Sequence, residues 1–257
     1  MSIDPRAVVD PAARIGKDVS IGAFSIIGPD VEIGDGTWIG PHVVINGPTT
    51  IGKENRFFQF ASIGEIPQDK KFHGESSRLE MGDRNTVREF VTINRGTDDG
   101  GGVTRIGSDN WLMAYIHIAH DCMVGDHIIM ANAASLAGHV TIHDHAILGG
   151  FTLVHQFSAI GSHAFCGMGS AISKDVPPFV MVNGNPAHPH GLNTEGLKRH
   201  ERSKEQLQAL REAYRIIYRS GHTINEAKHH LQGLAEQYED VRTMVEFIEQ
   251  STRGILR

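Results

Sequence analysis

Apolar residues recur at every sixth position along most of the chain. A first series runs over positions 3–63 in one phase, breaks at Asp69 and Glu75, and returns over positions 81–93. The second series has no interruption and consists of Ile106, Leu112, Ile118, Val124, Met130, Leu136, Ile142, Leu148, Val154, Ile160, Cys166 and Ile172. Because 40% of the residues are hydrophobic, twelve successive matches have a chance probability on the order of 10⁻⁵. The period therefore reflects the fold.

A period of six fits neither an α-helix, which repeats every 3.6 residues, nor a single strand, which repeats every two. It fits a three-sided prism in which each unit forms one flat β face with one inward aliphatic side chain. Three units close a coil of 18 residues, and successive coils stack as parallel strands about 4.8 Å apart. Glycine often follows the inward residue, as in Ile15-Gly16 and Ile106-Gly107. We expect these glycines to provide the backbone angles of the corners. The sequence thus predicts a parallel, hexapeptide-repeat β-helix over residues 1–190.

Two segments leave the repeat, at residues 64–80 and 95–105. The first contains Gln68-Asp69-Lys70-Lys71-Phe72, and the second contains Asp98-Asp99-Gly100-Gly101-Gly102. Insertions in a solenoid become loops on one face, and this is often the binding face. The simpler interpretation is a passive excursion, and the pattern alone leaves both open.

The period changes after two proline-containing segments near residues 177–186. Ser203–Gln206 and Thr223–Glu226 have the spacing of helix-capping boxes, and each precedes apolar residues at helical spacing. A third amphipathic stretch contains Val241, Met244, Phe247 and Ile248. We therefore expect a small α-helical domain over residues 191–257.

The 18-residue coil places several polar residues next to one another on the outer surface. His120, Gly138 and Gln156 fall in one column, and Asp121 and His139 fall in the next. The expected outward patch consists of His117, His120, Asp121, His139, His155 and Gln156. A single histidine is most often a hydrated surface residue. Four histidines beside a carboxylate favour a site for proton transfer near neutral pH.

A second histidine column contains His127, His145 and His163, each 18 residues apart at a corner position. Stacked imidazoles can bind a metal ion or lower one another's pKa. Exposed corner residues without a function are the simpler interpretation.

Composition limits the classes of function and location. The 257 residues carry a net charge of −6, which argues against a nucleic-acid-binding protein. The first residues show no charged segment followed by an apolar one, and no apolar run approaches the roughly 20 residues that span a bilayer. We therefore expect no signal peptide and no stable membrane insertion. Cys122 and Cys166 are interpreted as free thiols in a reducing compartment, so we expect a cytoplasmic protein.

Several motifs together resemble the UDP-N-acetylglucosamine 3-O-acyltransferases, a family of hexapeptide-repeat enzymes of lipid A biosynthesis. The resemblance covers nearly the whole chain. The matching segments are Gln68–Phe72, His117–Cys122, Leu136–Val140, Val154–Phe157, Asp175–Pro178, Asn193–Arg199 and Ser251–Gly254.

The resemblance implies a left-handed coil and a homotrimer with active sites between neighbouring β-helices. It implies transfer of an (R)-3-hydroxyacyl chain from acyl carrier protein to the 3-hydroxyl of UDP-N-acetylglucosamine. The position of His120 matches the general base, and Gly138 matches the backbone oxyanion donor. Either Asp121 or a neighbouring carbonyl would fix the tautomer of His120. No cofactor and no metal are expected, since phosphopantetheine arrives on the carrier protein. The positions that match or adjoin the substrate site are Asp69, Lys71, Asn94, His117, His139, His155, Gln156, Asn193, Glu195 and Arg199.

Three positions depart from the common pattern of the family. Asn94 stands where relatives often carry His, and His200 stands where many carry a second Arg. Because of Asn94, the identity of the acceptor sugar stays undecided. Because of His200, the prediction that two arginines bind the diphosphate is weakened. Met168 stands where relatives that accept long chains carry Gly, so we expect a medium-length acyl chain.

Other functions remain open from the sequence. N-acylation of a UDP-3-amino sugar would use the same fold. A related enzyme that N-acylates a UDP-glucosamine carries an additional N-terminal domain, whereas this repeat begins at Ile3. A zinc hydratase needs three histidines that meet at a subunit interface. A non-enzymatic scaffold would leave the histidine patch unexplained.

Overall fold

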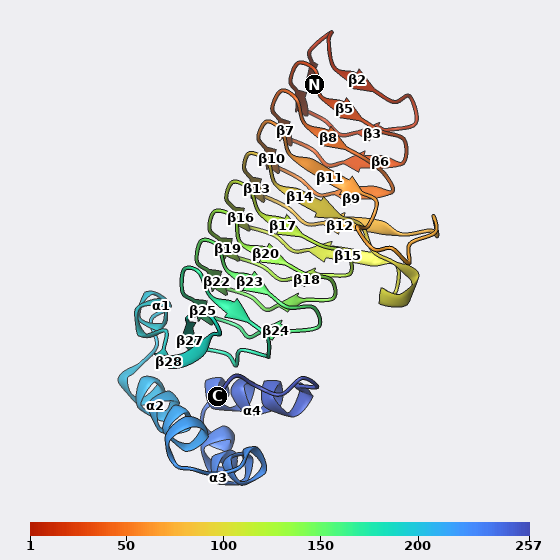
Figure 1. Ribbon diagram of the computed structural model, residues 1–257. Coiled ribbons are helices and arrows are strands. Elements are labelled where there is room, and N and C mark those ends of the chain that lie inside the picture. Colours follow the sequence, from red (N-terminus) through yellow and green to blue (C-terminus); the bar gives the residue numbers. More distant parts are fainter.

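The six-residue period appears in the structure as short strands separated by turns. A computed structural model describes all residues 1–257. Twenty-eight strands form three sheets, here called A, B and C, which are the sides of a long prism with the helices at its C-terminal end (Figure 1). Every pairing within the sheets is parallel except that of the last two strands. The predicted three-sided parallel β-helix is confirmed.

The strands follow one another through the three sheets in turn. Sheet A contains β1 (Ser2–Ile3), β4 (Ser20–Ile21), β7 (Trp38–Ile39), β10 (Arg56–Phe57), β13 (Thr86–Val87), β16 (Trp111–Leu112), β19 (Ile129–Met130), β22 (Ile147–Leu148), β25 (Phe165–Cys166), β27 (Val180–Asn183) and β28 (His188–Leu192). Sheet B contains β2 (Val8–Val9), β5 (Ile26–Ile27), β8 (Val44–Ile45), β11 (Ser62–Glu65), β14 (Thr92–Asn94), β17 (His117–Ile118), β20 (Ser135–Leu136), β23 (Leu153–Val154) and β26 (Ala171–Ile172). Sheet C contains β3 (Arg14–Ile15), β6 (Val31–Ile33), β9 (Thr49–Ile51), β12 (Arg78–Met81), β15 (Val103–Ile106), β18 (Met123–Val124), β21 (Thr141–Ile142) and β24 (Ala159–Ile160).

The inward residue of each unit forms the core of the prism. Ile21 pairs in register with Ile39, and Ile39 pairs with Phe57, so side chains of one coil stack on those of the next. All three are buried, while their strand neighbours Ser20 and Trp38 are partly exposed. Burying one such side chain contributes about 1.5–3 kcal/mol relative to leaving it exposed. Each coil therefore adds to one continuous core.

The corners of the prism do not depend on glycine in the way the sequence suggested. The left-handed backbone angles fall mostly on other residues, such as Asp18 (φ 55°), Phe24 (φ 60°) and His145 (φ 61°). Gly34 follows an inward residue and has no positive φ, but a Cβ there would lie 2.5 Å from the carbonyl oxygen of Gly52 in the next coil. The expected role of these glycines was therefore wrong. They permit the close approach of stacked backbones, and the angle at the corner belongs to a later residue.

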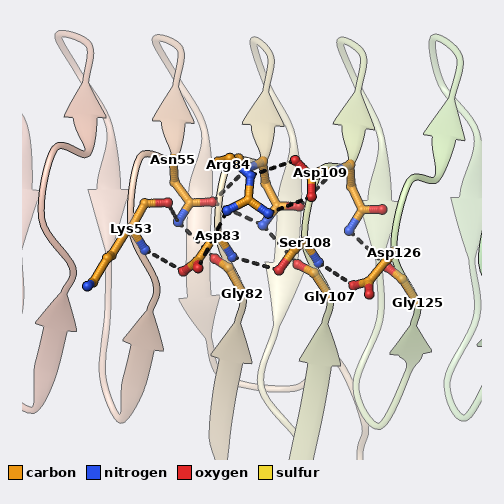
Figure 2. Close-up of polar contacts among 12 residues, drawn as sticks. Lys53, Asn55, Gly82, Asp83, Arg84, Gly107, Ser108, Asp109, Gly125 and Asp126 are labelled. Atoms are coloured by element: carbon orange, nitrogen blue, oxygen red, sulfur yellow. Dashed lines mark hydrogen bonds and ion pairs between the residues drawn. The ribbon is translucent and has the colours of Figure 1, made fainter.

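Polar side chains replace strand pairing at the corner between sheets C and A, called the CA corner (Figure 2). Asn85 donates from Nδ2 to Asn55 Oδ1 at 3.0 Å and to the Gly107 carbonyl at 2.9 Å. Beside them, the Ser108 N–H donates to Asp126 Oδ1 at 2.6 Å. Buried backbone groups require partners. At this corner the chain leaves one sheet before it enters the next, so no strand pairing is available. The side-chain ladder supplies hydrogen-bond partners there.

Both excursions leave the prism at the corner between sheets B and C, called the BC corner. The first connects β11 to β12, and the second connects β14 to β15 through the short 3₁₀ helix η1 (Asp98–Gly100). Figure 1 shows the two loops projecting side by side from the same edge of the prism. Because the loops come from successive coils, they form one wall beside the coils that follow.

Four helices follow the last strand: α1 (Thr194–Arg199), α2 (Lys204–Arg219), α3 (Ile224–Gln237) and α4 (Glu239–Gln250). The two predicted capping boxes are both formed, at the N-termini of α2 and α3. The chain end returns to the prism, where the Leu256 N–H donates to the Asp175 carbonyl at 2.9 Å. This contact joins the helical segment to the end of the β-helix. None of the helices is long and apolar enough to span a bilayer.

Candidate active site

The histidine patch lies at the BC corner, immediately after β17. Ile118 points into the core, and the turn that follows brings His120 to the surface. Asp121 adopts the left-handed corner conformation, with φ of 60°. One coil later His139 occupies the equivalent position, with φ of 61°, and its N–H donates to the His120 carbonyl at 3.1 Å. The repeat thus sets the spacing of the two histidines.

His120 and Asp121 form a hydrogen-bonded pair. His120 Nδ1 lies 2.7 Å from Asp121 Oδ2. Thr97 donates to the same carboxylate from its N–H at 2.8 Å and from Oγ1 at 2.7 Å. Burial raises the pKa of Asp121, but the hydrogen bonds from His120 and Thr97 outweigh it, so the pKa lies below its ordinary value. The carboxylate therefore stays ionised and favours a proton on Nδ1 of His120, which leaves the lone pair of Nε2 free to accept a proton.

The expectation that Asp121 faces outward was wrong, because its side chain is only 1% exposed. The corner conformation turns the carboxylate under the second loop, and Thr97 closes over it. Asp121 therefore reaches the surface only through its histidine neighbours, of which His120 is hydrogen-bonded to it.

His139 completes the cluster from the neighbouring coil. Its ring meets that of His120 edge-on at 5.2 Å and stacks on Phe157 at 4.5 Å. His139 Nε2 lies 3.6 Å from Asp121 Oδ2. The possible ligand atoms of His120, Asp121 and His139 lie within 4.8 Å of one another. The donors of Thr97 already occupy both carboxylate oxygens, which favours an orienting carboxylate over a metal ligand.

An open pocket of about 420 Å³ lies against this cluster. A Cβ at Gly138 would lie 2.6 Å from Cε1 of His120, so only glycine lets the ring rest on the backbone there. The Gly138 N–H donates to no acceptor of the chain. It is thus a free backbone donor beside the ring of His120. The pocket is lined by Gln68, His117, Ala119, His120, Ser135, Leu136, Ala137, Gly138, Leu153 and Val154.

His117 lies deeper in the pocket wall. Thr92 Oγ1 is 2.7 Å from His117 Nδ1. Burial, and to a lesser degree the neighbouring His120, lowers the pKa of His117. A neutral imidazole in this place can donate or accept a hydrogen bond to a sugar without carrying charge.

Comparisons with known proteins agree over the whole chain. A family model described as "Udp N-acetylglucosamine O-acyltransferase; Domain 2" matches residues 175–256. A protein of Halorhodospira halophila named "Acyl-[acyl-carrier-protein]--UDP-N-acetylglucosamine O-acyltransferase" is 58% identical over 255 residues, which is 99% of each chain. A protein of Thiobacillus denitrificans with the same name is 55% identical over 256 residues, covering 100% of this chain and 99% of that one. The chain belongs to the acyl-[acyl-carrier-protein]–UDP-N-acetylglucosamine O-acyltransferase family.

Solved structures of this family have the same fold. The LpxA structure from Acinetobacter baumannii matches with a TM-score of 0.98 at 48% identity over 99% of both chains. That from Moraxella catarrhalis matches with a TM-score of 0.98 at 45% identity over 100% of both. The resemblance seen in the sequence motifs is therefore confirmed, and the fold is consistent with the left-handed coil it implied.

Within this family fold, Asn94 has an internal position. It is 3% exposed, and its Nδ2 donates to the Ile66 carbonyl at 2.9 Å. Asn94 therefore holds the base of the first loop, and its side chain does not reach the surface where an acceptor sugar would bind. The interpretation that Asn94 lines the substrate site does not hold within one chain, because the start of the first loop covers Asn94 and takes its side-chain hydrogen bond.

The loop residues divide between two hollows. Gln68 lines the pocket of His120, whereas Asp69 and Lys71 line a neighbouring hollow of about 320 Å³ together with Thr97. Gln68 and Thr97 are the site residues that the sequence interpretation missed. Gln68 stood in the quoted loop motif, while nothing in the period pointed to Thr97.

His155 and Gln156 lie one coil further along and are exposed. His155 Nδ1 lies 3.1 Å from the Gln156 carbonyl. Neither residue lines the pocket of His120 within a single chain.

The residues predicted to contact the nucleotide belong to α1. Asn193 caps this helix: its Oδ1 accepts from the Gly196 N–H at 3.1 Å, and its Nδ2 donates to the His163 carbonyl at 3.0 Å. Glu195 is exposed and pairs with Lys198 at 2.8 Å. Arg199 is exposed and forms no ion pair in the chain. Because α1 packs near His163 at the CA corner, one chain does not bring these residues to the BC corner.

Proposed function

We propose that the protein transfers an (R)-3-hydroxyacyl chain from acyl carrier protein to the 3-hydroxyl of UDP-N-acetylglucosamine, the first step of lipid A biosynthesis. The single observation that carries the chemistry is the His120–Asp121 pair at 2.7 Å beside the free N–H of Gly138. The printed names of relatives that are 58% and 55% identical support the same substrates.

A sugar hydroxyl is a poor nucleophile at neutral pH, so a base must remove its proton as the new C–O bond forms. His120 Nε2 accepts that proton, and the Gly138 N–H stabilises the oxyanion of the attacked thioester carbonyl. When the carbonyl re-forms, the C–S bond breaks and the proton passes from His120 to the departing thiolate. The products are the 3-O-acyl sugar nucleotide and the free phosphopantetheine thiol of the carrier protein.

A covalent acyl-enzyme is not part of this proposal. The two thiols of the chain are fully buried, and burial raises the pKa of Cys122 and of Cys166 to about 12. Neither is a thiolate at neutral pH. Direct transfer needs no cofactor beyond the donor, and we place the reaction in the cytoplasm.

The carrier protein is acidic in general character, so a basic surface suits it. An open hollow of about 820 Å³ on the helical segment has an apolar floor that includes Leu207 and Leu234. Its rim carries both basic and acidic side chains, namely Lys204, Arg211, Glu205 and Glu212. The segment before α2 carries three further basic residues, Lys198, Arg199 and Arg202. We propose this helical surface as the docking site for the carrier protein.

The decisive experiment incubates UDP-N-acetylglucosamine with a series of 3-hydroxyacyl carrier proteins and identifies the products by mass spectrometry. We expect one acyl chain to be added to the sugar through an ester that mild base hydrolyses. The same assay is run in parallel with a UDP-3-amino sugar as acceptor. An amide product from that sugar, with no ester product from UDP-N-acetylglucosamine, would contradict the proposal.

We expect the active form to be a homotrimer. The BC corner carries His120, whereas α1 lies at the CA corner, so a site that uses both must combine two prisms. Light scattering of the purified protein should give the mass of three chains. A monomer with full activity would contradict this expectation.

Thr97→Val should lower kcat about 10-fold with little change in KM, because it removes one of the hydrogen bonds that hold the Asp121 carboxylate. Thr97 is a positioning residue that acts through Asp121 on His120. Thr97→Ser keeps the hydroxyl and should restore kcat. Steady-state kinetics of both variants check this, and equal losses in both would assign Thr97 a packing role only.

Arg199→Ala should weaken UDP-sugar binding about 10-fold, because a charge-assisted hydrogen bond to phosphate is worth about 1.5 kcal/mol or more. Arg199 is exposed and unpaired, so its loss should leave the fold intact. Titration calorimetry with UDP measures the affinity. Arg219→Ala, an exposed arginine at the end of α2, is the matched control. Unchanged affinity in Arg199→Ala would remove Arg199 from the nucleotide site.

A further inference from the structure

Three histidines meet at the CA corner, away from the pocket of His120. His145 and His163 stack with ring centroids 4.7 Å apart and planes 8° from parallel. His200 meets both edge-on, at 4.7 Å from His145 and 4.5 Å from His163. The possible ligand nitrogens of the three rings lie within 4.8 Å of one another. We call these residues the histidine triad.

The triad is assembled by the contact between α1 and the β-helix. Asn193 donates to the carbonyl of His163 and caps the helix, which fixes where α1 begins. His200 is the C-cap of the same helix, and its N–H bonds the Gly196 carbonyl. The start of α1 is thus tied to the prism, and the end of this short helix places the His200 ring over the stacked pair.

The corner itself does not require histidine. Earlier coils place Asp18, Glu54, Arg84 and Asp109 in the equivalent left-handed position. Histidines occupy this column only in the later coils, and the third ligand comes from α1. The arrangement is therefore specific to the place where the helical segment joins the prism.

The chemistry of the triad suits a divalent ion of the first transition series. Burial, and then the neighbouring His145 and His200, lowers the pKa of His163 to about 4. Burial also lowers the pKa of His145. Neutral imidazoles have free lone pairs at neutral pH, and three of them with one water are a common zinc ligand set. His200 is exposed, which leaves access for the ion and the water.

Two charged groups act on the triad in opposite directions. Asp144 adjoins His145 and attracts a cation, while Arg202 repels one. Arg202 Nε is itself paired with Asp240 Oδ2 at 2.9 Å, which offsets much of its charge. A tetrahedral ion with bonds of about 2.0–2.1 Å requires ligand nitrogens about 3.4 Å apart. The ligand nitrogens lie up to 4.8 Å apart, so the rings must approach one another, and His145 and His163 must tilt out of their parallel stack for their lone pairs to converge on one ion. Exposed His200 can turn toward them.

We propose that His145, His163 and His200 bind one Zn²⁺ ion, which fastens α1 to the β-helix. The ion would hold Glu195 and Arg199 in one orientation, since both lie on α1. This site is structural and separate from His120. The inference does not rest on the proposed acyl transfer.

The test uses the full-length protein after treatment with a chelator and its removal. Equilibrium dialysis with ZnCl₂ alone should show one Zn²⁺ per chain that depends on the triad. His200→Ala should weaken this binding by at least about 100-fold, since even indirect partners of a zinc ligand change affinity 10–100-fold. Zn²⁺ should raise the unfolding temperature of the wild type and not that of His200→Ala. Co²⁺ in place of Zn²⁺ should give the visible spectrum of a tetrahedral site.

Two controls separate the triad from the other histidines. His127→Ala removes a ring that stacks on His145 at 4.8 Å but lies outside the triad, and should leave binding unchanged. His230→Ala disrupts the pair formed with His222 on the helical domain and should also have no effect. Zn²⁺ binding that survives His200→Ala would overturn the proposal. Binding that is lost only in His139→Ala would assign the ion to the cluster at His120 and would overturn it as well.

Discussion

His120→Ala is expected to lower the rate of acyl transfer by about 10²–10⁴-fold, the usual effect of removing a general base. The imidazole of His120 lines the pocket and is hydrogen-bonded to the buried carboxylate of Asp121 at 2.7 Å, whereas His139 lies 3.6 Å from that carboxylate and does not line the pocket. Its side chain is at the surface of a corner, so its removal should leave the core intact. Single-turnover assays with acyl carrier protein donor measure the chemical step directly.

The control for this prediction is His229→Ala, which removes an exposed histidine from α3. It should retain the activity of the wild type. Asp121→Asn offers a second, independent check, because it keeps the shape of the pair but removes the charge that fixes the tautomer of His120. Activity of His120→Ala within a few-fold of the wild type, in a protein with unchanged circular dichroism, would refute the assignment of the base.

Met168→Gly is expected to shift the preferred acyl chain from the 3-hydroxydecanoyl or 3-hydroxydodecanoyl class toward 3-hydroxytetradecanoyl. Cys166 fills the inward position of β25, and Met168, two residues later, is 77% exposed at the corner between sheets A and B. Leu153 lines the pocket of His120 and is 54% exposed. It pairs in register with Ala171, which follows Met168 closely in the sequence. An acyl chain that crosses sheet B along these apolar residues reaches Met168.

A filled apolar groove rejects extra methylene groups at a cost of about 1–3 kcal/mol, which discriminates between chains by about 10- to 200-fold. Competition between donors of each length, read by mass spectrometry, measures the ratio of their kcat/KM values. Met168→Leu keeps the bulk and should keep the medium-length preference, so it is the matched control. A wild type that already prefers the tetradecanoyl donor, or a glycine variant with an unchanged ratio, would show that Met168 does not set the length.

The period of the sequence was sufficient for most of the fold. An aliphatic residue at every sixth position has one way to be buried along so long a chain, which is to line a prism of stacked coils. The registers Ile21 with Ile39 and Ile118 with Leu136 follow from 18 residues per coil. The same arithmetic placed His120 beside Gly138, and local capping signals placed the starts of α2 and α3. These features depend on spacing along the chain.

Other features were decided by contacts between segments with no common period. Asp121 was expected to be exposed and is buried, because Thr97 from an inserted loop closes over it. Asn94 was expected to line the substrate site and instead holds the base of a loop. An insertion has its own conformation, so its contacts cannot be read from the repeat.

The histidine triad shows the same limit on a larger scale. The sequence determined that His145 and His163 stack, since they lie 18 residues apart. It contained no signal that His200, beyond the end of the repeat, would lie over them. That contact depends on where the turn after β28 directs α1, and this direction is set by the Asn193 bond to the His163 carbonyl. Periodic burial fixes neighbours within the prism, whereas the docking of a helix on its corner depends on individual hydrogen bonds and side-chain packing that arise only in the folded chain.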